Sequence, residues 1–182
     1  IIGLIVRIDN QDRFVRASDI DGRLGEANNP DWKVVAFDET SGAIVAPRGT
    51  IGFRWGESGK WNLDETVSSG KPIELRLSLA DIKDEFADVA FPYFGNIEHA
   101  HFASTSHASV LERRVPVKRL KLADGETLVA TVHDLLLANY GVDCGYGGGN
   151  VATSLDDDAP YTPAWAEKIT GVARDKIIQV AR

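Results

Sequence analysis

Methionine is absent from the 182 residues of this chain. Translation starts at methionine, so the chain does not show the start of a reading frame. The first residues, Ile1 to Val6, have the composition of the inside of a strand. The helical pattern that reaches Arg182 has no closing glycine or asparagine after it. We therefore expect the chain to be an internal piece of a longer polypeptide.

Cysteine is almost absent, since Cys144 is the single one. One cysteine excludes an internal disulfide framework and is compatible with a reducing compartment. It also excludes a self-contained iron–sulfur site, because such clusters need about four ligands of the cysteine type. A structural zinc site would need histidine in place of nearly every cysteine.

Long apolar runs and an excess of positive charge are also missing. No run approaches the ~20 residues of a membrane-spanning helix, so we expect a soluble segment with no direct membrane insertion. The net charge of −7 and the pI near 5.1 argue against a nucleic-acid surface, which needs clustered basic residues. A signal peptide is not visible, but a chain cut at its front could not show one.

The residues that are present describe an ordinary globular chain, with 43% hydrophobic and 26% charged residues. Residues 1–8 and 14–17 form one predicted hairpin, and residues 32–37 and 43–45 form a second. Residues 50–55 alternate like a strand, and residues 64–72 have the composition of an exposed loop. Residues 73–79 alternate strictly and give the clearest strand pattern in the chain.

The middle of the chain is less regular. We expect a short helix at residues 84–90, which the aromatic cluster around Pro92 breaks. Residues 99–109 have the composition of a polar surface loop. A further strand at 116–122 turns at Asp124-Gly125 into residues 127–130.

Helix signals gather near the end of the sequence. Thr131 is a good N-cap and pairs with Asp134 as in a capping box. The following helix, residues 132–140, should bury Val132, Leu135 and Leu136 and end at Gly141. Residues 141–160 are predicted to be a loop.

A second helix begins at Thr162-Pro163 and stops at Thr170-Gly171, and a third begins near Arg174. The predicted class is α+β, with a strand-rich first two thirds and short helices in the last third. Residues 1–182 are one segment, with a strand- and loop-rich part at 1–115 and a strand–turn–strand with helices at 116–182.

The C-terminal sequence resembles a stretch of the molybdopterin oxidoreductase superfamily. The resemblance lies in YTPAWAEKITGV, from Tyr161 to Val172, followed by DKIIQVAR, from Asp175 to Arg182. The strand–turn–strand and helix that precede it follow the superfamily order. Its specificity comes from its length, and no residue in it is reactive.

Four further stretches resemble the alpha subunit of membrane-bound respiratory nitrate reductases. They are LGEANNPDWK from Leu24, IGFRWGESGKWN from Ile51, AFPYFG from Ala90 and LANYG from Leu137. They follow the family order and cover most of the chain.

This resemblance implies a parent oxidoreductase that reduces nitrate to nitrite with electrons from quinol. Its implied cofactors are a molybdenum bis(molybdopterin guanine dinucleotide) and a [4Fe–4S] cluster, whose ligands fall before Ile1, while the cofactor pocket continues after Arg182. The implied partners are the rest of the alpha subunit, an iron–sulfur beta subunit and a membrane gamma subunit, on the cytoplasmic face of the membrane. No catalytic, cofactor-binding or metal-binding residue of the family falls within this chain.

Two motifs invite a ligand-binding interpretation. His99 and His101, with His107 nearby, could hold a metal, but no cysteine flanks them and they fall in a predicted polar loop. The glycine-rich run from Gly145 to Asn150 lacks both the Gly-Lys-Ser/Thr of a P-loop and a following helix, so we interpret it as a flexible loop.

Two more groups of residues could form a site. Asp156, Asp157 and Asp158 could bind a hard cation, but adjacent aspartates do not converge, and a structural role before the helix at Pro163 is favoured. Cys144 would need a base such as His133 to act as a nucleophile, and no nucleophile signature surrounds it.

The tryptophans Trp55 and Trp61, with Arg54 and Lys60 between and beside them, are the most interesting cluster. Packing within the domain and docking against a neighbouring domain or subunit both stay open. Stacking on a pterin is the least favoured alternative.

The leading hypothesis is a structural segment of a nitrate reductase alpha subunit that is inactive alone. The alternative is a free-standing binding or protein-interaction module related to this region. An independent hydrolase that uses His99, His101 or Cys144 is a remote third.

Overall fold

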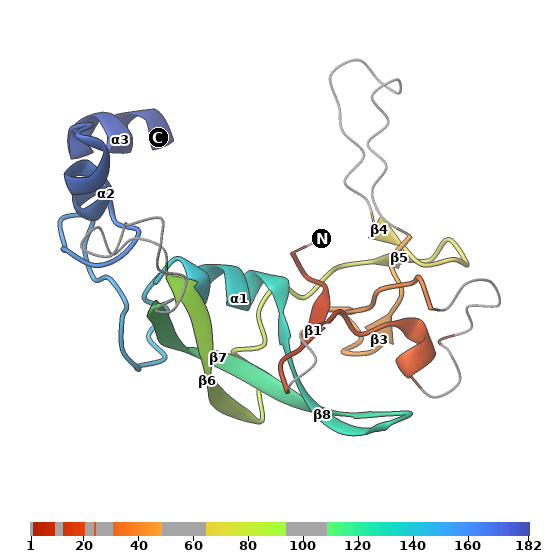
Figure 1. The fold of residues 1–182 in the computed structure, drawn as a ribbon. Helices are drawn as coiled ribbons and strands as arrows, with labels where there is room; N and C mark the ends of the chain where they lie inside the picture. Colours follow the sequence, from red (N-terminus) through yellow and green to blue (C-terminus); the bar gives the residue numbers. More distant parts are fainter. Residues whose placement is uncertain (1, 10–12, 21–23, 25–30, 49–64, 94–108) are drawn as a thin grey trace, which may run out of the picture. The chain divides into compact units, whose positions relative to one another are not determined.

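The computed structural model describes residues 2–9, 13–20, 24, 31–48, 65–93 and 109–182 and has an α+β fold (Figure 1). The described strands all end by residue 131, and the three α-helices all lie beyond it, as predicted. The chain divides into two compact units. The first contains residues 1–85 and 116–134, and the second contains residues 86–115 and 135–182.

The largest sheet has four strands in the order β1-β8-β7-β6. These are β1 (Ile5–Arg7), β8 (Gly125–Thr131), β7 (Ser109–Leu122) and β6 (Glu85–Tyr93). Strand β8 is antiparallel to both β1 and β7, and Leu122 lies opposite Gly125 at the β7–β8 turn. The strands β6 and β7 begin in one unit and end in the other, because the division falls at residues 85 and 115.

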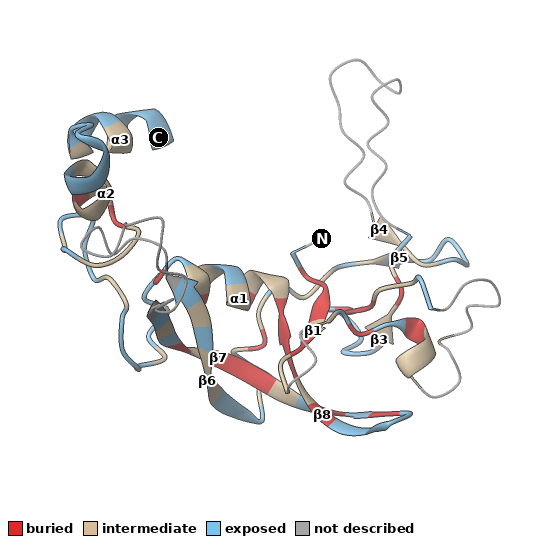
Figure 2. Ribbon diagram, in the orientation of Figure 1, coloured by how far each residue is buried: buried red, intermediate tan, exposed pale blue. Residues whose placement is uncertain are grey.

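The described part of the first unit also contains two small hairpins and a turn of 3-10 helix. Strand β2 (Ala36–Phe37) pairs with β3 (Ile44–Val45), and β4 (Glu65–Thr66) pairs with β5 (Pro72–Ile73). The 3-10 helix η1 spans Ala17–Asp19. Figure 2 shows the buried residues of this unit along β1, β8 and the segments around them. They form one apolar core, which includes Ile5, Val15, Val35, Leu79 and Val129, all fully buried.

Three helices of eight residues each follow β8: α1 (Val132–Asn139), α2 (Pro163–Thr170) and α3 (Arg174–Ala181). Asp134 N–H donates to Thr131 Oγ at 3.1 Å, which confirms the predicted N-cap of α1. Trp165 N–H donates to Thr162 Oγ at 3.1 Å, and Gly171 closes α2 with φ +71°, so both ends of this helix are as predicted.

The helix predicted at residues 84–90 is wrong, because residues 85–90 belong to strand β6. Ala87, Val89 and Phe91 are half-buried and alternate with exposed neighbours such as Asp88 and Ala90. This period of two fits a strand beside β7, and sheet pairing overrides the local helix propensity.

The strand predicted at residues 73–79 is mostly wrong, and the loop predicted at 64–72 contains the β4–β5 hairpin. After β5, successive backbone N–H groups donate hydrogen bonds to different segments of the chain. Arg76 N–H donates to Phe37 O at 2.9 Å, whereas Leu79 N–H donates to the Asp134 carboxylate at 2.8 Å. Because its hydrogen bonds go to different segments, this part of the chain does not form a continuous β-ladder with one strand, although its sequence alternates.

The buried face of α1 also differs from the prediction. Leu136 is 43% exposed, while Asp134 and Ala138 are the buried residues of this helix. Val132 and Leu135 are half-buried. The helix turns a polar side chain inward because the Asp134 carboxylate accepts the Leu79 N–H and lies 3.0 Å from the Thr131 hydroxyl.

Candidate functional site

The candidate site lies in the second unit, where α1 ends and a long loop leads to α2. Gly141 ends the helix with φ +68°, and its N–H donates to Ala138 O at 2.9 Å. The loop then returns to this point, since Ala152 N–H donates to Gly141 O at 2.9 Å. A hollow therefore has one wall at residues 140–143 and another at residues 152–155.

A buried arginine on β7 ties this loop to the helix. Arg113 is 1% exposed; its Nε–H donates to Asn150 O at 2.8 Å and its Nη1–H to Asn139 O at 3.0 Å. The Asn139 carbonyl belongs to the last turn of α1, where the negative end of the helix dipole favours a cation.

No carboxylate of the described residues forms an ion pair with Arg113. Its Cζ lies 5.8 Å from the ring centroid of Tyr161, within the range of a cation–π contact. Burial lowers the pKa of Arg113, because the charged form loses hydration, and the nearby Tyr161 opposes this change. The guanidinium nevertheless stays charged at neutral pH.

Gly141 is required here for two reasons. Its left-handed φ is unfavourable for a residue with a side chain. A Cβ at this position would also lie 2.9 Å from Arg113 Nη2 and 3.1 Å from Asn150 O. The end of α1 and the buried guanidinium therefore fit together only with glycine.

The glycine-rich run follows β7 closely. A Cβ on Gly148, which has φ +91°, would lie 3.1 Å from Arg114 Cβ. Asn150 Nδ2–H donates to Glu112 O at 3.3 Å, and the Tyr146 ring lies 5.2 Å from the Phe86 ring. No helix follows this run before α2, so the prediction of a loop is confirmed. The glycines let the loop backbone approach the strand.

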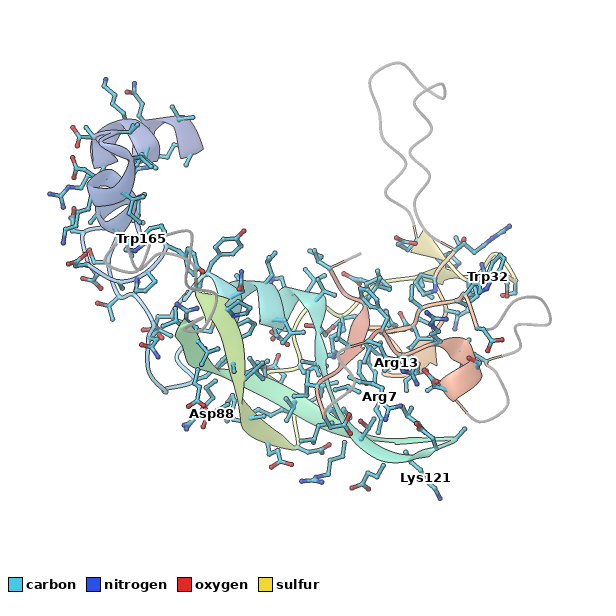
Figure 3. The ribbon with its side chains drawn as sticks, viewed as in Figure 1. Arg7, Arg13, Trp32, Asp88, Lys121 and Trp165 are labelled. Atoms are coloured by element: carbon cyan, nitrogen blue, oxygen red, sulfur yellow. The ribbon has the colours of Figure 1, made fainter. Side chains whose placement is uncertain are left out.

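Tyr161 is the centre of a small aromatic row. Its ring meets that of Tyr140 edge-on at 5.8 Å and that of Trp165 at 5.3 Å. Trp165 projects from α2, as labelled in Figure 3. The backbone of Tyr161 has φ +72°, a strained conformation for a bulky residue that the surrounding contacts must hold.

The three consecutive aspartates bind three different partners. Asp156 pairs with Arg174 at 2.9 Å, and Asp158 pairs with Lys168. Asp157 accepts the Thr153 N–H at 2.7 Å, and this hydrogen bond lowers the pKa of its carboxyl group. The three carboxylates thus point to separate structural contacts rather than to one shared cation.

The hollow itself has a volume of about 740 Å³. Its lining includes the large side chains of Tyr140, Val142, Leu155 and Tyr161, and Asp143 supplies a carboxylate. Such a space, with few polar groups on mainly apolar walls, is suited to binding an apolar group with an adjacent charge.

Several candidate residues from the sequence are not among the residues that the structure describes. His99, His101, His107, Trp55 and Trp61, with Arg54 and Lys60, fall outside the described residues.

His133 and Cys144 lie in different units, and Cys144 is half-buried. His133 Nδ1 lies 3.8 Å from Asp134 Oδ1. In the described part of the chain, no three His, Cys, Asp or Glu side chains are grouped closely enough to hold a metal.

Arg113, which joins the loop to the end of α1, is a residue of this site that the sequence did not predict. The signal was present, because Arg113 shares the buried alternation of β7 with Val115 and Val117. An arginine at a core position of a strand predicts a buried charge with dedicated partners. Those partners, the carbonyls of Asn139 and Asn150, come from distant segments and carry no signal in the sequence.

No helix in the described ranges has the length and apolar character that crossing a membrane requires. No protein-family model matches the chain.

Individual proteins do match it, over 93% of its length in each case. The chain is 55% identical to the respiratory nitrate reductase 1 alpha chain and 54% identical to the respiratory nitrate reductase 2 alpha chain, both of Escherichia coli K12. It is 42% identical to the nitrate reductase alpha chain of Bacillus subtilis 168. It spans 14% of each E. coli protein and 13% of the B. subtilis protein. The chain is therefore homologous to one segment of the nitrate reductase alpha chains, as its sequence motifs indicated.

Proposed function

We propose that the chain is a structural segment of the catalytic alpha subunit of a respiratory nitrate reductase. The observation that carries this proposal is the 55% identity to an E. coli alpha chain over 93% of the present chain. The parent would reduce nitrate to nitrite with electrons from quinol, and residues 1–182 would be one internal segment that does not react alone.

The parent would carry its redox centres outside this segment. The implied centres are a molybdenum bis(molybdopterin guanine dinucleotide) and a [4Fe–4S] cluster. One property of the chain supports this proposal: its single cysteine, Cys144, cannot by itself hold a [4Fe–4S] cluster, which needs about four cysteine-type ligands. We assign no step of the reaction to this segment.

The segment would contact the rest of the alpha subunit, in a complex with an iron–sulfur beta subunit and a membrane gamma subunit on the cytoplasmic face. The alternative is a free-standing binding module with common ancestry. A continuous reading frame on both sides of residues 1–182 supports the segment, whereas a start codon at Ile1 would support the module.

A substitution at Arg113 tests the structural role within the full-length alpha subunit. We expect Arg113→Ala to lower the yield of assembled enzyme, because the Asn139 and Asn150 carbonyls lose their donor. Nitrate turnover per bound molybdenum, measured with reduced viologen, should stay within about twofold of the wild type. The matched control is Arg114→Ala, which removes a more exposed pair with Asp88.

A drop of more than about tenfold in turnover per molybdenum in the Arg113 variant would contradict the structural role, since it corresponds to roughly 1.4 kcal/mol of lost transition-state stabilisation. The isolated 182-residue chain should show no nitrate reduction and no stoichiometric Mo, Fe or Zn. Turnover by that chain alone would contradict the proposal directly.

A further inference from the structure

Several apolar side chains that line the hollow of the second unit are exposed to solvent. Tyr140, Val142 and Leu155 line it and are 54%, 46% and 50% exposed. Single exposed apolar residues are normal, but several around one hollow of about 740 Å³ mark a binding surface. The hollow is therefore expected to be covered in the working protein.

The charge of the hollow indicates what covers it. Asp143 is exposed at its rim and accepts the Gly145 N–H at 2.9 Å. No lysine or arginine of the described ranges forms an ion pair with Asp143, whereas the nearby Asp156 and Asp158 are paired with Arg174 and Lys168. A positively charged group of a partner could form an ion pair with Asp143, as Arg174 does with Asp156 and Lys168 with Asp158.

The walls of the hollow are held in place before anything binds. Tyr161 is fixed by its edge-on contacts with Tyr140 and Trp165, despite its left-handed φ of +72°. Arg113 fixes the loop through Asn150. A site that is already ordered loses little conformational entropy when it is filled.

We infer that this hollow receives a segment of the same polypeptide from outside residues 1–182, with an apolar side chain against Tyr140 and Leu155 and a lysine or arginine beside Asp143. The inference rests on the proposed function, because the chain spans 14% of the matched E. coli alpha chains and most of such a polypeptide lies outside it.

Photo-crosslinking in the assembled full-length enzyme tests the inference. We expect Tyr140→p-benzoylphenylalanine to crosslink to an alpha-chain peptide outside residues 1–182 that contains a lysine or arginine. Adding Asp143→Asn should reduce the crosslink yield several-fold. The matched control Asp175→Asn removes an exposed charge on α3, outside the hollow, and should leave the yield within about twofold.

A crosslink to another subunit or to a peptide within residues 1–182 would overturn the inference, and so would the absence of a crosslink. The same position-specific probe at Leu155 covers the case in which the Tyr140 variant fails to assemble. Nitrate turnover of the same preparation separates the two proposals. An active enzyme without the crosslink refutes only the docking, and an inactive, cofactor-loaded enzyme with the crosslink refutes only the proposed function.

Discussion

Among the described residues, each of the two units buries one arginine, and the two arginines have different partners. Arg7 of the first unit, labelled in Figure 3, donates to the Asp124 carboxylate at 2.8 Å and lies 3.7 Å from Asp9. This hydrogen bond lowers the pKa of Asp124. Arg113 of the second unit meets only backbone carbonyls and an aromatic ring among the described residues. Among the described residues, carboxylates therefore neutralise Arg7, whereas two backbone carbonyls, one of them at the end of α1, hold Arg113.

Apolar burial shows the same contrast. In the described part of the first unit, ten buried apolar residues form one cluster. In the second unit, α3 contributes no buried residue, and Tyr140, Val142 and Leu155 stay about half exposed. Among its described residues, the first unit thus buries a continuous apolar cluster, while the second leaves apolar side chains at the surface of the hollow.

The largest expected effect is in the core of the first unit. Leu79→Ala should cost about 2–5 kcal/mol, because it removes a fully buried side chain and leaves a cavity. Amide hydrogen exchange of β8 in the full-length subunit should become faster by more than about tenfold. Leu77→Ala, at a position 41% exposed, is the control and should change exchange little. Equal effects of the two variants would show that the first unit does not depend on this core.

Removal of the buried charge of the second unit comes next. Arg113→Ala should cost roughly 2–4 kcal/mol, since two carbonyls lose their donor in a buried environment. Exchange should become faster at the end of α1 and around Asn150, while β8 stays protected. A loss of protection in β8 as large as at Asn150 would contradict the separation of the two units.

A glycine pair then separates strain from crowding. Gly141→Ala should cost about 1–3 kcal/mol, because it adds left-handed strain and a contact 2.9 Å from Arg113 Nη2. Gly145→Ala has a similar φ of +74° with nothing within 4 Å, so it should cost only the strain, about 1 kcal/mol. Local exchange of residues 138–152 measures both. Equal costs would show that the guanidinium moves aside freely.

The smallest effect is a pH dependence of the aspartate turn. The pKa of Asp157 is lowered in the folded chain, mainly by the Thr153 N–H, so its stabilisation is present above the ordinary aspartate pKa and is lost as the pH falls below about 4. Exchange of residues 150–158, corrected for intrinsic rates, should accelerate on acidification. Asp157→Asn should remove this dependence, and Asp143→Asn should keep it. A wild-type turn that is insensitive to acid would refute the assignment.

Element ends were predictable where a local signal is sufficient. The threonine caps at Thr131 and Thr162 and the glycine stops at Gly141 and Gly171 all lie where the sequence placed them. These signals work because a cap satisfies backbone groups of its own helix turn. Strand β6 was not predictable in this way, since its pairing partner β7 begins sixteen residues later, at Ser109 after Tyr93.

The sequence by itself determined the α+β class, the boundaries of α1 and α2 and, through its long motifs, the homology to nitrate reductase alpha chains. Only the tertiary structure showed that Arg113 meets Asn139, Asn150 and Tyr161, and that Asp143 is left beside an open apolar hollow. The reason is the range of the interactions. Capping and alternation act within a few residues, whereas the surroundings of a buried charge are made by segments that come together only on folding.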